Sequence, residues 1–377
     1  MKKVVNENYE NEEYLTEQII TYIGNKRSLL GFIGDAVDVV KTELKKDKLD
    51  VVDIFSGSGI VSRYLKQHSS KLIANDLEDY SYVLNKCYLS NKNDLDMDEL
   101  VSWYNYLKEN LDTDLKDGLI SEMYAPKDIN NIRPGERCFY TTRNAKYIDT
   151  ARQLINDVPE QYQVYFIAPL LTEASVKNNT SGVFKGFYKN SKTGVGQFGG
   201  NDKNALSRIT RDIDLPFPVF SNFNCEVEVY KEDANELVKK LNMVDLIYMD
   251  PPYNQHPYGS NYFMLNLIDD YVKPKEVSEV SGIPTDWHRS KFNQAREALK
   301  TFEELCRNAK AKYLLISFNN EGFIKKEEMV NMLSKIGDVT VMEKKYNTFR
   351  GSRNLNNRDI HVKEYLYLVR VKKYKEV

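Results

Sequence analysis

The sequence feature that most constrains the fold is a short apolar run that ends abruptly at two prolines. Residues Val244 to Met249 lead directly into the tetrapeptide Asp250-Pro251-Pro252-Tyr253. Because proline has no N–H to donate and fixes its own φ, this pattern predicts a buried strand whose last residue feeds a rigid loop. In open α/β sheets, ligands bind outside the carboxyl ends of the strands, so this loop is a predicted site.

The residue types in this loop indicate what it binds. The carboxylate of Asp250 and the carbonyl of Pro251 can accept hydrogen bonds from an exocyclic amine. Tyr253 offers a flat face on which a base can stack. The predicted guest is an amine on a planar ring, and a proline-stiffened loop without chemistry is the alternative if the tetrapeptide stands alone.

The same alternation of strand-like and helix-like segments occurs at both ends of the chain. It stops at about Asn91 and returns at about Glu226, which indicates an α/β fold with a long insert. Helices are predicted at 29–44 and 60–67 in the first part, and at 98–111, 145–157 and 161–175 in the insert. The predicted strands are residues 49–55, 71–75, 226–230, 244–249, 312–317, 339–342 and 364–371.

A glycine turn follows the first predicted strand. Gly57 and Gly59 let the backbone approach a nucleoside closely, although a bare Gly-x-Gly is a weak signal. Asp76 ends the next strand, 23 positions after Asp53, where an acidic residue is placed to bind ribose hydroxyls. The chain has no phosphate-binding Gly-Lys-Ser/Thr segment, which suits a cofactor without phosphates.

Two basic segments are candidates for contact with nucleic acid. From Lys177 to Arg211 there are seven Lys or Arg against one acid, interleaved with aromatic residues and glycines. From Lys344 to Lys363 there are six against one. Such segments are typical of loops that hold a phosphate backbone. The alternatives are a solvated charged loop for the first segment and an exposed hairpin loop for the second.

Several motifs, taken in order, resemble one family. Asp250-Pro251-Pro252-Tyr253 looks like the catalytic motif of amino methyltransferases, and Tyr22-Ile23-Gly24-Asn25-Lys26 is similar to their cofactor loop before the first strand. Along the chain, the loop with Lys26 is followed by the glycine turn, Asp76, the long insert and a second acid, Asp233. This order resembles that of the DNA adenine-N6 methyltransferases of the D12 type, the group containing the Dam methylases. The likeness is closest to modification methylases of the type paired with the FokI endonuclease, through segments 180–189, 250–262, 317–322 and 349–354. Residues 255–258 depart from that pattern, because an arginine is expected in this loop.

The resemblance implies transfer of a methyl group from S-adenosylmethionine to adenine N6 in double-stranded DNA, with the target base flipped out of the duplex and no metal required. A separately encoded restriction endonuclease is a possible partner. The implied fold is a Rossmann-like, mostly parallel seven-stranded sheet with its last strand inserted antiparallel. We expect a cofactor-binding half at 1–90, an inserted target-recognition region at 91–220 and a catalytic half at 221–377.

The candidate residues fall into three groups. Catalytic roles are expected for Asp250, Pro251, Pro252 and Tyr253. Cofactor contacts are expected for Tyr22, Gly24, Asn25, Lys26, Asp53, Phe55, Gly57, Gly59, Asp76, Leu77, Asp233, Ala234 and Asp250. DNA contacts are expected for Lys185, Lys189, Lys192, Tyr258, Asn261, Arg350 and Arg353.

Composition excludes other classes of protein. Among the 377 residues no apolar run approaches the roughly 18 that a membrane helix needs. Four widely separated cysteines form no Cys-x-x-Cys pair, which disfavours a structural zinc and fits a reducing cytoplasm. The net charge of -2 gives no global nucleic-acid signal. Two rival functions remain open: an amino methyltransferase acting on DNA cytosine N4 or ribosomal RNA guanine, and a non-catalytic DNA-binding protein with a methyltransferase fold.

Overall fold

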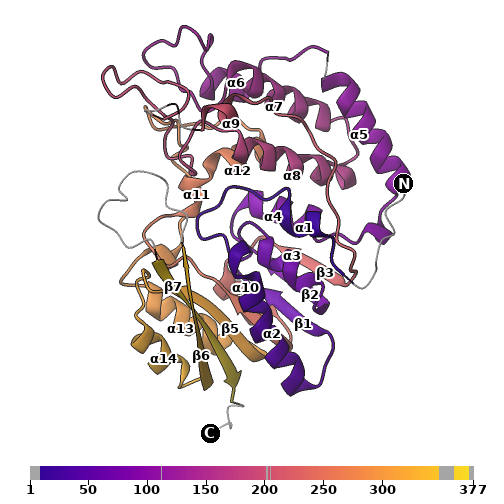
Figure 1. Cartoon of the computed structure of the whole chain (residues 1–377), viewed down its shortest axis with the longest axis vertical. Helices are drawn as coiled ribbons and strands as arrows, with labels where there is room; N and C mark the ends of the chain where they lie inside the picture. Colours follow the sequence, from indigo (N-terminus) through magenta and orange to yellow (C-terminus); the bar gives the residue numbers. More distant parts are fainter. Residues whose placement is uncertain (1–8, 112, 201–202, 204, 348–360, 373–377) are drawn as a thin grey trace.

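A seven-stranded sheet runs through the lower half of the molecule (Figure 1). The computed structural model describes residues 9–111, 113–200, 203, 205–347 and 361–372. The sheet order is β3-β2-β1-β4-β5-β7-β6. Its strands are β1 (Leu49–Asp53), β2 (Ser69–Asn75), β3 (Glu226–Tyr230), β4 (Val244–Met249), β5 (Ala311–Asn319), β6 (Gly337–Asn347) and β7 (His361–Val371). Strand β7 is antiparallel to both of its neighbours, while β1 to β5 pair in parallel, which confirms the predicted fold class.

Helices surround the sheet and build a second layer above it (Figure 1). Around the sheet lie α1 (Glu12–Thr16), α2 (Leu30–Leu44), α3 (Ile60–Lys66), α4 (Asp79–Tyr88), α10 (Ala234–Lys240), α13 (Ala298–Asn308) and α14 (Lys326–Leu333). The upper layer holds α5 (Met97–Leu111), α6 (Leu119–Tyr124), α7 (Thr142–Ile155), α8 (Glu160–Val176), α9 (Leu206–Thr210), α11 (Tyr258–Asn261) and α12 (Phe263–Asp270). Three short 3-10 helices are η1 (Arg27–Leu29), η2 (Lys92–Asp94) and η3 (Lys291–Asn293).

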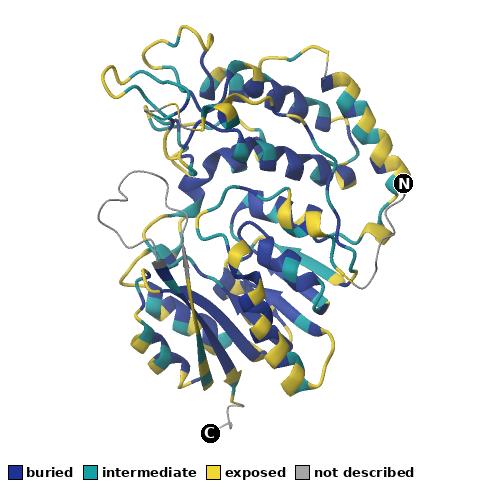
Figure 2. Cartoon of the chain, viewed as in Figure 1, coloured by how far each residue is buried: buried dark blue, intermediate teal, exposed yellow. Residues whose placement is uncertain are grey.

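Both faces of the sheet are covered, which explains why β4 reads as a continuous apolar run. Leu246 and Tyr248 join one core with helices α2 and α3, and Ile247 and Met249 join the other with α10, α13 and α14. A strand buried on both faces shows no alternation of apolar and polar residues. Figure 2 shows the central strands buried along their length.

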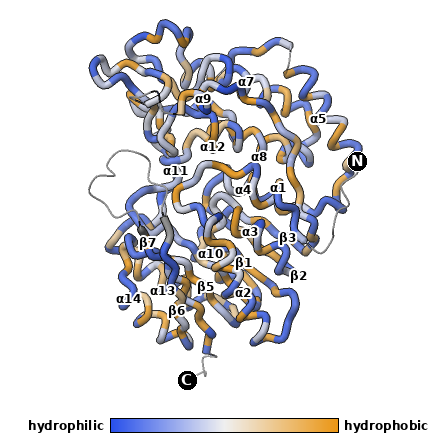
Figure 3. The backbone as a smooth tube through the Cα atoms, in the orientation of Figure 1, coloured by the Kyte–Doolittle hydropathy of each residue, from blue (hydrophilic) through white to orange (hydrophobic). Residues whose placement is uncertain are grey.

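A third core holds the upper layer together. It joins buried residues of α5, α7 and α8 to α4 beside the sheet and to α12, which follows the Asp250 loop in the chain. Helix α8 has buried residues around most of its circumference, and Figure 3 colours its backbone by hydropathy. Such a helix must be covered on all sides. The insert therefore packs directly on the elements that carry the predicted site.

The segment assignments from the sequence agree with this structure to within a few residues for the strands β1 to β5 and for helices α5, α7 and α8. All four cysteines are buried and unpaired. Across the described residues, no helix combines the length and the apolarity needed to cross a bilayer.

Candidate active site

A cleft opens at the carboxyl ends of the parallel strands. Its walls are the segments after four neighbouring strands: Asp53–Ser58 after β1, Asn75–Glu78 after β2, Glu232–Ala234 after β3, and Asp250 with Pro252 after β4. It encloses about 920 Å³, including its open mouth. Carboxyl ends of parallel strands meet at one edge of a sheet, so four stretches far apart in the sequence converge on one site.

The glycine turn after β1 is held by the acid after β2. The Gly57 N–H donates to Oδ2 of Asp76 at 2.8 Å, and the Glu78 N–H donates to Oδ1 at 3.1 Å. Gly57 has φ +51°, and a Cβ there would lie 2.9 Å from the Tyr22 hydroxyl, so glycine is required on both counts. Burial and the neighbouring Glu78 raise the pKa of Asp76 to about 6.

Two further acids predicted from the sequence line the same cleft. Oδ1 of Asp233 caps helix α10 by accepting from the N–H groups of Asn235 and Glu236. The fully buried Asp53 accepts a 2.6 Å hydrogen bond from the Ser62 hydroxyl, and burial raises its pKa to about 7. Burial thus raises the pKa values of both Asp53 and Asp76, and perturbed carboxyl groups that share a cleft are a mark of functional sites.

Asp250 lies at the inner end of the cleft beside a buried lysine. Its Oδ1 is 3.1 Å from Nζ of Lys26, and the same ammonium is 3.3 Å from Oε1 of Glu364 on β7. Asp250 keeps 18% of its side chain exposed, whereas Lys26 and Glu364 are buried. Burial raises the pKa of Asp250 to about 6 against the opposing effect of Lys26. Lys26 was predicted to contact the cofactor, and here its ammonium is directed at two carboxylates.

Tyr253 is half-buried and is not among the residues that line the cleft. Nζ of Lys26 is 5.6 Å from its ring centroid, and its ring meets Phe318 edge to face at 5.8 Å. Its hydroxyl approaches Gly24, where a Cβ would lie 3.1 Å away. The segment Tyr22 to Lys26 and the Asp250 loop are therefore in contact.

Two other predicted residues lie outside the lining. Pro251 is buried beside Asp250. Gly59 forms the N-cap of α3 with φ +76°, against the amide of Asn85. Gly24, Asn25, Phe55, Leu77 and Ala234 are among the lining residues, as predicted.

An aromatic stack supports the loop that contains Tyr22. The Tyr22 ring contacts Tyr258 at 5.1 Å and Tyr262 at 4.8 Å between centroids, those two rings are 6.0 Å apart, and all three are nearly parallel. The Tyr258 hydroxyl donates to the carbonyl of Ile23 at 3.3 Å, and Tyr258 lines the cleft. The DNA contact predicted for Asn261 does not fit this structure, because that side chain is buried at 2% exposure beneath the insert.

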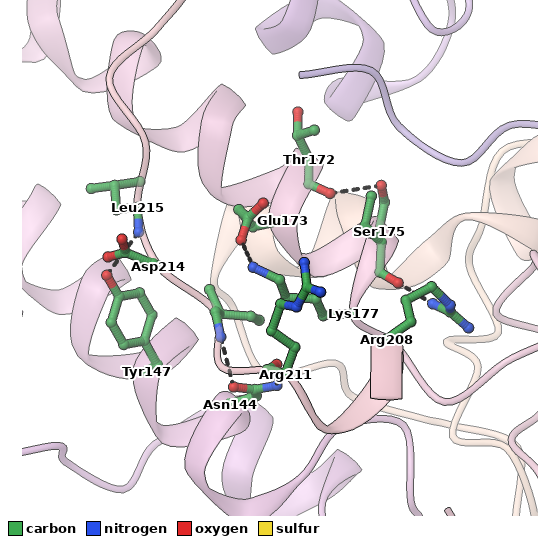
Figure 4. Close-up of polar contacts among 12 residues, drawn as sticks. Asn144, Tyr147, Thr172, Glu173, Ser175, Lys177, Arg208, Arg211, Asp214 and Leu215 are labelled. Carbon is green, nitrogen blue, oxygen red and sulfur yellow. Dashed lines mark hydrogen bonds and ion pairs between the residues drawn. The ribbon is translucent and has the colours of Figure 1, made fainter. Parts of the chain in front are cut away.

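The basic segment of the insert divides into two kinds of residue. Lys177 pairs with Glu173, and Arg208 donates to the carbonyls of Val176 and Asn178, so both hold the insert together (Figure 4). Lys185 and Lys192 are exposed, and Lys189 lies over the ring of the buried Phe187 at 5.0 Å.

The interleaved aromatic residues of this segment have a packing role. Phe184 and Phe187 belong to the core of the upper layer instead of standing free for a base. Arg350 and Arg353 lie outside the described residues.

Sequence reasoning missed several residues at this site. Glu364 is the clearest: it is a fully buried acid in a strand that otherwise supplies apolar residues to the core. A charge inside an apolar strand pattern was the available signal. Phe292 lies edge to face with Phe55 at 5.2 Å and comes from the short 3-10 helix η3, which carries no motif. Three further lining residues lie in or just before η3: His288, Ser290 and Asn293.

Comparisons with known proteins identify the family of this chain. The family model described as D12 class N6 adenine-specific DNA methyltransferase matches residues 22–332. The type II methyltransferase M.NlaIII of Neisseria lactamica is 31% identical over 93% of this chain and 99% of its own length. M.CviAII of Paramecium bursaria Chlorella virus 1 is also 31% identical, over 93% and 98%. M.FokI of Planomicrobium okeanokoites is 26% identical over 92% of this chain and 52% of its own length. The chain therefore belongs to the D12 class of N6 adenine-specific DNA methyltransferases.

Proposed function

We propose that this chain uses S-adenosylmethionine to methylate the N6 of an adenine in a specific sequence of double-stranded DNA. The observation that carries the proposal is Asp250, a partly exposed carboxylate at the inner end of a cleft whose walls are the ends of four neighbouring strands. Such a carboxylate can accept a hydrogen bond from an amine held over the cleft.

The cleft fits this cofactor. Gly57 brings a bare backbone to the cleft wall, and each oxygen of Asp76 accepts one backbone N–H and keeps a second lone pair for a ribose hydroxyl. Both capping bonds of Asp233 go to Oδ1, which leaves Oδ2 for an adenine amine. Phe55 and Phe292 supply an aromatic wall. When bound, the cofactor supplies an electrophilic methyl group on a cationic sulfonium, and the surrounding acids complement that charge.

The target adenine must leave the duplex to reach Asp250, at a cost of a few kcal/mol. We assign stacking of the flipped base to Tyr253, which offsets part of that cost. Hydrogen bonds from the N6 amine to Asp250 and to the Pro251 carbonyl localise the nitrogen lone pair and orient it. Pro252 keeps this segment stiff, because its φ is fixed.

We assign target recognition to the insert, residues 91–220. The backbone N–H of Phe184, the residue before Lys185, donates to the carbonyl of Asn261 at 2.7 Å, which supports a place for this lysine near the loop after Tyr253. Lys185, Lys189 and Lys192 are the proposed phosphate contacts. Because several relatives are named type II methyltransferases or modification methylases, we also propose that the chain is the modification enzyme of a restriction-modification system.

The experiment that tests the function is sequencing of DNA from cells that express the protein, by a method that reports N6-methyladenine. We expect N6-methyladenine at one short sequence motif and nowhere in the DNA of control cells without endogenous adenine methylation. Methylation of cytosine N4 or of ribosomal RNA instead would support the rival amino methyltransferases. DNA binding without any methylation would support a non-catalytic protein.

A further inference from the structure

Three charged side chains meet at the base of the cleft: Asp250 and Lys26 are among its lining residues, and Glu364 lies behind them. Lys26 lies between Asp250 at 3.1 Å and Glu364 at 3.3 Å. Lys26 and Glu364 are 2% and 0% exposed. They come from segments far apart in the sequence, the loop before η1 and the antiparallel strand β7.

The buried carboxylate of Glu364 requires a physical explanation. An unpaired charge in a protein interior is strongly unfavourable, so its partners must hold it. Ser317 on β5 donates a 2.6 Å hydrogen bond to Oε1 of Glu364, and Lys26 supplies the opposite charge. The remaining strand residues of β7 facing the sheet cores are apolar or aromatic, among them Leu366, Tyr367 and Leu368. An apolar residue at position 364 would suit the packing of β7, but it would leave Lys26 to pair with Asp250 alone.

We propose that Glu364 is a positioning residue for methyl transfer. It shares the Lys26 ammonium with Asp250, so Lys26 holds Oδ1 of Asp250 without cancelling the negative charge of the site. Oδ2 of Asp250 is then left to meet the adenine amine. The inference rests on the proposed function. One ammonium between two carboxylates leaves a net negative charge at the base of the cleft.

The other groups that face Asp250 do not change this balance. Burial raises the pKa of Asp53 on β1 to about 7, so this carboxyl is largely protonated at the pH where Asp250 titrates, and Tyr248 on β4 stays neutral because burial raises its pKa. Burial also raises the pKa of Tyr253 and of Tyr258, which keeps them neutral. Of these groups, Lys26 is the cation, and Glu364 controls how much of its charge acts on Asp250.

The chemistry explains why a net negative site is useful. The amine nitrogen forms a bond to the methyl carbon while the bond from carbon to sulfur breaks and its electron pair stays on sulfur. The nitrogen gains positive charge as this happens, and one of its protons leaves through Oδ2 of Asp250 to water. Negative charge that is already fixed beside the nitrogen before the reaction stabilises this developing positive charge.

The test compares Glu364→Gln with Lys26→Gln. In Glu364→Gln the glutamine oxygen still accepts the hydrogen bond from Ser317, so we expect the fold to be unchanged. We expect the affinities for cofactor and DNA to change by no more than about twofold. We expect kcat to fall roughly tenfold to a hundredfold, the range of a misplaced catalytic group. In the pH profile of kcat, the acid limb is expected to move to lower pH in Glu364→Gln, because an anion that repels the Asp250 carboxylate is gone. It is expected to move to higher pH in Lys26→Gln, because the cation beside that carboxylate is gone.

A second readout is independent of activity. Titration of the Asp250 carboxyl by carbon-13 NMR in the free protein is expected to show its pKa lowered in Glu364→Gln and raised in Lys26→Gln. The matched control is Glu343→Gln on β6, a surface acid 2.7 Å from Lys363, which is expected to move neither readout. Glu364→Asp keeps the charge and is expected to restore the wild-type pH midpoint.

The outcomes separate the inference from the proposed function. If Glu364→Gln folds and leaves both kcat and the Asp250 titration unchanged, the positioning role is wrong. Loss of cofactor affinity with unchanged kcat at saturation also overturns it, since Glu364 then shapes only the cofactor site. If the wild type does not methylate adenine while the NMR shifts occur as expected, the proposed function fails and the charge network stands.

Discussion

The backbone N–H of Phe184 donates a 2.7 Å hydrogen bond to the carbonyl of Asn261. This bond joins the basic segment of the insert to helix α11, which follows the Asp250 loop in the chain. The loop that carries Lys185 is thus fixed beside α11, whose Tyr258 lines the cleft. Its position follows from packing, since Phe184 itself is part of the insert core.

Neutralising Lys185, Lys189 and Lys192 together to Gln is expected to weaken binding to specific and random duplexes alike. Phosphate contacts position a protein without reading sequence. The salt dependence of binding flattens by about 0.9 log units per lost contact, and the methylated motif does not change. The measurement is a salt series of binding isotherms, with Lys45, Lys300 and Lys335 to Gln as a control of equal charge, because these are exposed lysines outside the insert. A changed motif with an unchanged salt slope would show that the three lysines read bases.

Methylation is expected to fall as the pH drops through about 6, the raised pKa of Asp250. The sign follows from the chemistry: the ionised carboxylate accepts the amine hydrogen, and the protonated acid accepts it poorly. Single-turnover rates between pH 5 and 8 measure this, with circular dichroism at each pH to show that the fold persists. A flat profile through pH 6 in a folded protein contradicts the assigned role.

Asp76→Ala is expected to raise the dissociation constant for S-adenosylmethionine. A hydrogen bond to a charged group contributes roughly 1.5 to 3 kcal/mol, and the loss of one such bond corresponds to about a tenfold to hundredfold change. The structure adds a second effect, because Gly57 also loses its acceptor. Asp245→Ala, which removes a buried acid at the opposite end of β4, is the control for general destabilisation. Calorimetric titration showing equal affinity for wild type and Asp76→Ala removes Asp76 from the cofactor site.

Tyr253→Ala is expected to lower turnover and to weaken retention of the flipped base, because stacking contributes about 1 to 3 kcal/mol per base. Tyr253→Phe keeps the ring and is expected to retain most of both. Fluorescence of 2-aminopurine at the target position reports base flipping. Equal signals for Tyr253→Ala and Tyr253→Phe would place the stacking surface on another residue.

Part of the site was predictable because it depends on local rules. Asp76, Asp233 and Asp250 each follow a strand, and the ends of parallel strands share one edge, so their convergence follows from strand order. The stiff Asp250 loop follows from its prolines. The seven-stranded sheet followed from the family resemblance, and the final hairpin agrees with it.

The remainder depends on packing between distant segments. Glu364 meets Lys26 only because β7 is inserted beside β5, and no spacing along the chain encodes that contact. Asn261 looked like a surface residue in a polar loop, but the insert covers it. Lys177 and Arg208 counted as free basic residues, although the fold uses both internally.

The central claim is that Asp250 orients the adenine amine for methylation. Its most direct test is incubation of wild type and Asp250→Ala with duplex DNA and S-adenosylmethionine, followed by digestion and detection of N6-methyladenine. We expect N6-methyladenine with the wild type only, while Asp250→Ala still binds cofactor and DNA measurably, because the carboxylate acts mainly on the amine. Loss of a positioned acceptor is expected to lower the rate by more than about tenfold. Methylation by Asp250→Ala at more than about a tenth of the wild-type rate would therefore contradict the account.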